Sequence, residues 1–151
     1  MNMSQYKAIV EIAVGNEEEA YEFYKNAALK TKDPSLISIF NELAKEELKH
    51  KALLQGYLND DFSGMVFKEG PDYKIAESLP LPQLTSDMKF TDAIVLAMKK
   101  EQQAMEMYQS FADASADQNQ KDMFSELAMM EKGHKARLED IYNDTAFVEA
   151  W

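Results

Sequence analysis

The chain has 151 residues, which is enough for one domain with a sizeable hydrophobic core. Acidic side chains number 27 and basic ones 16, so the formal charge is −11. Such an acidic surface repels phosphate backbones and anionic lipids, so we expect no nucleic acid or membrane partner. The absence of cysteine excludes disulfides, thiolate zinc sites, iron–sulfur clusters and a cysteine nucleophile.

The N-terminal segment does not resemble a secretory signal. It has no basic region at its start, and Glu11 interrupts its apolar stretch. No run approaches the roughly 18 apolar residues that a membrane span needs. The sequence therefore predicts a soluble, cytoplasmic protein.

Apolar residues recur every three or four positions in four segments rich in helix-forming residues. This pattern predicts helices over roughly residues 5–31, 35–58, 92–115 and 119–142. Asp33 and Pro34 are typical of an N-cap and the first residue of a helix. We therefore expect an all-α fold in which residues 1–151 form a single four-helix bundle.

The two halves of the chain are repeats of one another. At an offset of 84 positions, residues 17–58 align without a gap to residues 101–142, and fifteen of the 42 positions are identical. Chance gives roughly three identities at this composition. The sequence thus predicts two duplicated helical hairpins, 5–58 and 91–142, followed by a C-terminal tail, 143–151.

The segment between the hairpins, residues 59–90, is far longer than adjacent antiparallel helices need. A helix of about 24 residues is roughly 36 Å long, and an extended chain of this length spans that distance easily. We interpret the segment as a crossover linker along the bundle. It lets the second hairpin pack upside down against the first, so that equivalent residues meet at one level.

Each apolar helix stripe is interrupted near its middle by a Glu or by a Glu-x-x-His pair. The spacing of three in the pair puts both side chains on one helix face. The chain has only two histidines, and both occur in this pattern. The interrupting residues are Glu17, Glu47, His50, Glu101, Glu131 and His134.

Four carboxylates inside a bundle need either protons or cations, because each unpaired buried charge costs several kcal/mol. Four Glu balance two divalent ions, and carboxylate oxygen with imidazole nitrogen suits iron or manganese. One Glu from each of two helices plus a Glu-x-x-His from each of the other two is the ligand pattern of di-iron and di-manganese bundles. We therefore predict a site for two metal ions.

Other polar residues near the stripes have two readings each. Tyr24 and Tyr108 lie two turns after Glu17 and Glu101 and could donate hydrogen bonds to ligand carboxylates or fill the core. The neighbouring acids form a solvated face that could also attract cations. These acids are Glu18, Glu19, Glu22, Glu42, Glu46 and Glu126.

With both Glu-x-x-His motifs and both Glu-x-x-Ala-x-x-x-Tyr motifs placed, the chain resembles the ferritin-like di-iron carboxylate superfamily. It is most similar to stand-alone rubrerythrin-type proteins that lack a rubredoxin domain. The resemblance implies two iron ions per chain, with manganese as an alternative. It also implies that Glu47 and Glu131 bridge the metals, that Glu17 and Glu101 are terminal ligands, and that each metal has one histidine.

The resemblance implies an oxidoreductase that reduces hydrogen peroxide or O₂, with a role in oxidative stress. Because the chain has no cysteine for a rubredoxin iron, the electrons must come from an external donor such as a rubredoxin-like protein. We expect a homodimer or a larger homo-oligomer.

One position departs from the rubrerythrin pattern. Where rubrerythrins have a further Glu, one turn after the third-helix ligand, this chain has Ala104. The remaining four Glu and two His resemble the set of bacterioferritin, which implies a ferroxidase or iron-handling protein as the alternative. A hydroxylase, a manganese catalase and a structural role without metal are further alternatives.

Overall fold

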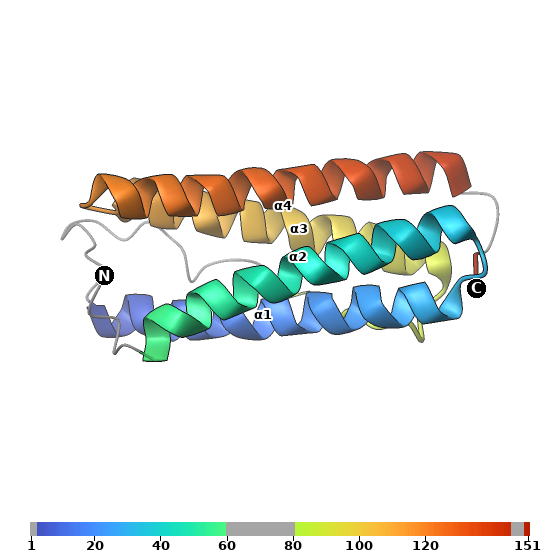
Figure 1. The fold of residues 1–151 in the computed structure, drawn as a ribbon, viewed down its shortest axis with the longest axis horizontal. Helices are drawn as coiled ribbons and strands as arrows, with labels where there is room; N and C mark the ends of the chain where they lie inside the picture. Colours follow the sequence, from blue (N-terminus) through green and yellow to red (C-terminus); the bar gives the residue numbers. More distant parts are fainter. Residues whose placement is uncertain (1–2, 60–80, 146–149) are drawn as a thin grey trace.

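The computed structural model describes residues 3–59, 81–145 and 150–151. Within these residues the chain forms four α-helices and no strand, which confirms the predicted all-α bundle. The helix bounds lie within three residues of those predicted from the apolar pattern. The helices are α1 (Met3–Lys30), α2 (Pro34–Asn59), α3 (Phe90–Ala114) and α4 (Gln118–Thr145) (Figure 1).

The helices pack as two antiparallel hairpins, α1 with α2 and α3 with α4. The end of α2 and the start of α3 lie at opposite ends of the bundle (Figure 1). This direction agrees with an inverted second hairpin. Most of the predicted crossover, residues 60–80, lies outside the described residues. In its described part, Leu84 is buried and donates its backbone N–H to Glu19 Oε1 at 3.1 Å.

The second helix of each hairpin begins at an aspartate N-cap. Asp33 Oδ1 accepts the backbone N–H of Ser35 at 2.9 Å, before α2. Asp117 Oδ2 accepts the backbone N–H of Gln120 at 3.0 Å, before α4. Each bond satisfies one of the backbone donors that a helix start leaves without a partner. Because Asp33 and Asp117 are 84 positions apart, the duplication includes the caps.

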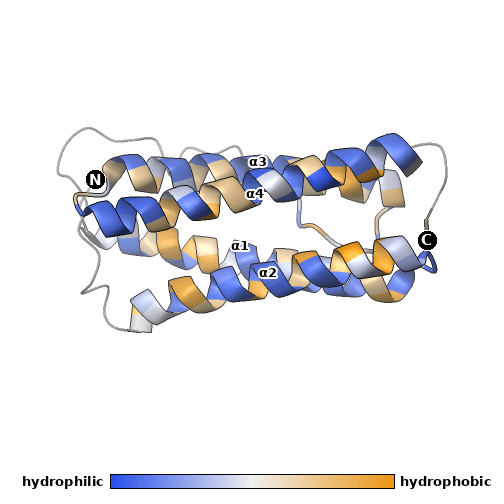
Figure 2. Ribbon diagram, turned by 45° about the horizontal axis from the view of Figure 1, so that its top comes forward, coloured by the Kyte–Doolittle hydropathy of each residue, from blue (hydrophilic) through white to orange (hydrophobic). Residues whose placement is uncertain are grey.

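The hydrophobic core consists of two clusters with repeat-related members. Tyr24 and Phe40 lie in one cluster, where their rings stack with centroids 6.3 Å apart. Tyr108 and Phe124 lie in the other, where their rings stack at 6.4 Å. Hydrophobic and hydrophilic residues alternate along all four helices (Figure 2). Equivalent residues therefore occupy opposite halves of the bundle, as an inverted packing of the two hairpins requires.

The last residue of the chain packs onto the bundle. The Trp151 ring makes an edge contact with Phe90 at 5.0 Å, and its indole N–H donates to the Met88 carbonyl at 2.9 Å. Lys30 lies over the same ring, 5.2 Å from its centre. Nothing in the sequence predicts this contact, since the position of a Trp at residue 151 does not indicate where its ring packs.

Within the described residues, none of the helices has an apolar stretch of the length that a bilayer crossing requires.

We expect Asp33→Ala and Asp117→Ala to lower the free energy of unfolding by about 1 kcal/mol each, because each removes an N-cap hydrogen bond. Urea unfolding followed by circular dichroism measures the change. Asp140→Ala is the control, since Asp140 is exposed within α4 and its loss changes the net charge equally. Equal losses in all three variants would contradict the cap assignment.

Candidate metal centre

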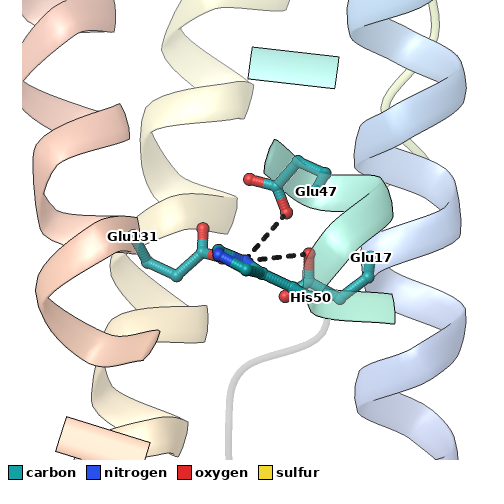
Figure 3. Close-up of side chains that lie close together, drawn as sticks. All are labelled: Glu17, Glu47, His50 and Glu131. Carbon is teal, nitrogen blue, oxygen red and sulfur yellow. Dashed lines mark hydrogen bonds and ion pairs between the residues drawn. The ribbon is translucent and has the colours of Figure 1, made fainter. Parts of the chain in front are cut away.

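Six polar side chains meet near the middle of the bundle, between the two hydrophobic clusters. They come from all four helices: Glu17 from α1, Glu47 and His50 from α2, Glu101 from α3, and Glu131 and His134 from α4. Each is only 1–3% exposed. Figure 3 shows four of them, with Glu131 approaching His50 from the opposite hairpin. The structure therefore brings together all six residues that interrupt the apolar stripes.

The two histidines make reciprocal contacts across the hairpins. His50 Nδ1 lies 2.8 Å from Glu131 Oε1, and His134 Nδ1 lies 2.6 Å from Glu47 Oε1. Their rings stack at 6.0 Å with an interplanar angle of 10°. In both rings the Nδ1 atom faces the carboxylates, so Nδ1 is the nitrogen available to a cation in the cluster.

The cluster contains two overlapping sets of four residues that could each hold a metal ion. Within each set, one donor atom from every residue lies within 4.8 Å of the others. Glu47 and Glu131 belong to both sets. Glu17 and His50 complete the first set, and Glu101 and His134 complete the second. This sharing is the geometry that two neighbouring ions with common carboxylate ligands need.

Two buried tyrosines support the outer carboxylates. Tyr24 donates its hydroxyl to Glu101 Oε1 at 2.7 Å, and Tyr108 donates its hydroxyl to Glu17 Oε1 at 2.5 Å. Burial raises the pKa of both phenols well above the usual value, and the nearby glutamates raise it further. The tyrosines therefore stay protonated and remain donors. The rings of both tyrosines lie in the hydrophobic clusters, and their hydroxyls donate to carboxylates of the polar cluster.

The carboxylates at the centre of the cluster resist ionisation. Burial raises the pKa of Glu47 and of Glu131 well above the usual range, and the charges of Glu101 and Glu17 raise it further. Burial acts in the same direction on Glu101, but its hydrogen bonds with Glu131 and His134 outweigh burial and lower its pKa. Without a cation, the cluster therefore holds protons.

The histidines hold protons as well. Burial alone lowers the pKa of a histidine, but contacts with Glu131 and Glu17 raise the pKa of His50 to about 9. For His134, contacts with Glu101 and Glu131 overcome burial and raise the pKa to about 11. A cation that replaces these protons must therefore release them.

Two buried oxygen atoms lack a hydrogen-bond donor. Among the described residues, Glu17 Oε2 and Glu101 Oε2 have no hydrogen-bond partner. Each instead lies near a histidine, 3.7 Å from His50 Nδ1 and 3.8 Å from His134 Nδ1. Buried polar atoms are rarely left unsatisfied in folded proteins. One such oxygen in each four-residue set fits a metal ion between the carboxylates and the imidazole.

A cavity of about 330 Å³ reaches the carboxylates from the side of α1 and α3. Its inner wall includes Glu17, Glu47, Glu101 and Glu131. Most of the remaining lining residues are apolar or uncharged, and Lys100 and Glu19 form a 3.0 Å ion pair among them. The apolar lining residues include Ile9, Ile12, Leu81, Leu84, Ala104 and Met107. The cavity gives a small molecule a way to the centre of the cluster.

Three of the neighbouring acids predicted to face solvent form ion pairs with a lysine or an arginine. Glu18 pairs with Lys51 at 2.5 Å, Glu42 with Arg137 at 2.8 Å, and Glu19 with Lys100.

Glu46 is different, because its carboxylate contacts His134 Nε2. The sequence predicts Glu46 on the solvated face and does not predict this contact. Its place beside Glu47 in the chain gives no sign that it reaches a histidine on another helix.

Comparisons with known proteins show the family and the fold of the chain. The family model described as Rubrerythrin matches residues 8–142. The solved structure of a hypothetical protein from Pyrococcus furiosus is similar, with a TM-score of 0.70 and 31% sequence identity. The alignment covers 94% of this chain and 92% of that one. No protein with curated function gives a significant match.

We expect the metal-free protein to lose stability as the pH rises from about 6.5 to 9. A pKa of about 9 for His50 and about 11 for His134, above the unfolded value of 6.5, means that the folded state binds more protons. Their contribution is complete below pH 6.5 and is lost as the pH rises through the folded values. The raised pKa values of Glu47 and Glu131 act with the same sign.

The measurement is the melting temperature of chelator-treated protein across this pH range. A His50→Gln, His134→Gln double variant is the control and is expected to show a shallower slope. A melting temperature that rises with pH in the unsubstituted protein would contradict the assignment.

Proposed function

The chain belongs to the rubrerythrin family, and on that premise we propose that it is a di-iron oxidoreductase that reduces hydrogen peroxide or O₂ with electrons from an external donor. The observation that carries the proposal is the pair of overlapping four-residue sets at the centre of the bundle. In this proposal the electrons come from a donor outside these 151 residues, which contain no cysteine that could hold a rubredoxin-type iron.

In this proposal Glu47 and Glu131 would bridge two metal ions, because they belong to both sets. Glu17 and Glu101 are terminal ligands, and their Oε2 atoms are free to accept a cation. Four carboxylates and two neutral imidazoles balance two divalent ions. Oxygen and nitrogen donors without thiolate favour iron, with manganese as the alternative.

When bound, two ferrous ions supply one electron each, the two electrons that reduce hydrogen peroxide to water with two protons. The chain itself orients and shields the site. Tyr24 and Tyr108 fix the outer carboxylates by hydrogen bonds. The two hydrophobic clusters close the site above and below, and the cavity between α1 and α3 admits the oxidant.

A second function is favoured by one residue. Ala104 lines the cavity at the position where rubrerythrins carry a further Glu, so no carboxylate from that position reaches the oxidant. With six ligands, the same cluster suits a ferroxidase, for which Fe²⁺ is the substrate rather than a resident cofactor. The two functions differ in the amount of iron that each chain takes up.

We expect Glu47→Gln with Glu131→Gln to abolish binding of two metal ions and to raise the metal-free free energy of unfolding by about 1–3 kcal/mol. The amides keep the shape of the carboxylates and are neutral at every pH, so the folded state no longer has to take up the protons that the raised pKa values of Glu47 and Glu131 require. Iron content per chain and urea unfolding provide the two measurements.

The matched control for this variant is Glu22→Gln with Glu126→Gln. Both residues are exposed glutamates, so this variant removes the same formal charge. It is expected to bind two metal ions as the unsubstituted protein does. Two irons per chain in the Glu47, Glu131 variant would disprove the bridging assignment.

Rapid mixing of anaerobic Fe²⁺-loaded protein with hydrogen peroxide, and separately with O₂, tests the proposed reaction. The signal is the near-ultraviolet absorption of the oxidised di-iron site, calibrated by iron per chain. We expect oxidation at least tenfold faster with peroxide at two irons per chain. Faster oxidation by O₂ with uptake beyond two irons would instead support the ferroxidase. Absence of both the band and retained iron would overturn the iron assignment.

A further inference from the structure

The two histidines differ in what lies behind them. On the side away from the cluster, His134 Nε2 contacts the Glu46 carboxylate. The corresponding atom of the other ring, His50 Nε2, contacts Met130 Sδ at 3.4 Å. Glu46 and Met130 are 84 positions apart, so they occupy equivalent places in the two repeats. The duplicated site is therefore asymmetric at one pair of positions.

The other contacts of the histidines match. Both Nδ1 atoms face a glutamate of the opposite hairpin, at 2.8 and 2.6 Å. The distances from the two rings to the Oε2 atoms of the outer carboxylates are 3.7 and 3.8 Å. Within residues 3–59 and 81–145, the ion pairs of the two histidines correspond one to one except for the pair with Glu46.

A carboxylate and a thioether act differently on a histidine ligand. A carboxylate that accepts the Nε2 proton fixes the ring and its tautomer, leaves Nδ1 as the donor atom and makes the imidazole a more basic ligand. A thioether sulfur is only a weak acceptor. The contact with Glu46 therefore fixes the His134 ring with Nδ1 toward the cluster, whereas the His50 ring, beside a thioether, is held less firmly.

We propose that the two metal positions are unequal, and that the position formed with Glu101 and His134 binds a divalent cation more tightly and fills first. Glu46 is the positioning residue, since it acts through the histidine rather than on the ion. This inference rests on the two-metal site of the proposed function. It adds an order of loading, with the Glu17 and His50 position as the later and more labile one.

The repeat supplies matched substitutions for a test. Glu46→Met gives both histidines a thioether neighbour, and Met130→Glu gives both a carboxylate neighbour. The double variant Glu46→Met, Met130→Glu exchanges the two environments. Glu46→Gln retains a hydrogen-bond acceptor without the charge. If Glu46→Gln keeps more of the metal affinity than Glu46→Met does, the effect comes from positioning of the His134 ring and not from side-chain packing at residue 46.

Each protein is titrated with Co²⁺ in the metal-free state by calorimetry and by visible absorption. We expect two steps for the unsubstituted protein, with dissociation constants about 10–100-fold apart. Glu46→Met weakens the first step by a similar factor and brings the two steps together. Met130→Glu strengthens the second step. Glu46→Gln is expected to fall between the unsubstituted protein and Glu46→Met.

Proton NMR of the Co²⁺-loaded protein identifies which position fills first. At one equivalent of Co²⁺, the shifted and exchangeable Nε2–H signal belongs to His134 in the unsubstituted protein and to His50 in the double variant. His50→Gln and His134→Gln variants assign these signals, because each removes one of them. A fold check by circular dichroism accompanies every variant.

The outcomes separate the two proposals. Two equal steps in the unsubstituted protein, or unequal steps that Glu46→Met leaves unchanged, would overturn the loading order while the two-metal site stands. Absence of Co²⁺ binding in the unsubstituted protein would overturn the site and the order together. If Met130→Glu does not fold, Glu46→Met still tests the loading order. Glu46→Met is expected to fold, because the side chain of residue 46 is partly exposed and an apolar side chain is tolerated there.

Discussion

Four buried glutamates that share one layer of a helical bundle are the constraint on which the rest of this structure depends. Their mutual repulsion and loss of solvent raise the pKa of Glu47 and Glu131, so the layer must hold protons or cations. The layer lies between two hydrophobic clusters, one with Tyr108 and one with Tyr24. The same apolar packing that stabilises the fold therefore buries the carboxylates and leaves the cavity beside α1 and α3 as their described route to solvent.

The duplication explains how one short sequence pattern, used twice, builds this layer. One hairpin design supplies two glutamates, one histidine and one tyrosine, and the inverted second copy supplies the same set from the other side. Contacts then form between the copies: Tyr24 with Glu101, and Tyr108 with Glu17. The two repeats differ where one has Glu46 and the other has Met130. Because the surroundings of the two histidines otherwise match, this difference can be tested with each half as the control for the other.

Much of this architecture could be predicted from the sequence, because it follows from local periodicity and from the repeat. The helix bounds, the Asp33 cap and the gathering of the six polar residues all follow from positions within one helix or from the offset of 84. The contact of Glu46 with His134, the packing of Trp151 and the cavity could not be predicted, because they depend on helix rotation and on long-range contacts. Metal identity, partners and assembly remain predictions.

The reciprocal contacts of the histidines have a mechanical consequence. His50 contacts Glu131 and His134 contacts Glu47, so each hairpin on its own carries three residues of one four-residue set and one residue of the other. Separation of the hairpins would dismantle both sets in one event, and ions held between them would act as a clasp on the closed bundle. The rate at which metal is lost would then depend on how often the two hairpins separate. The lifetime of the metal-loaded protein would follow the rate of this opening motion.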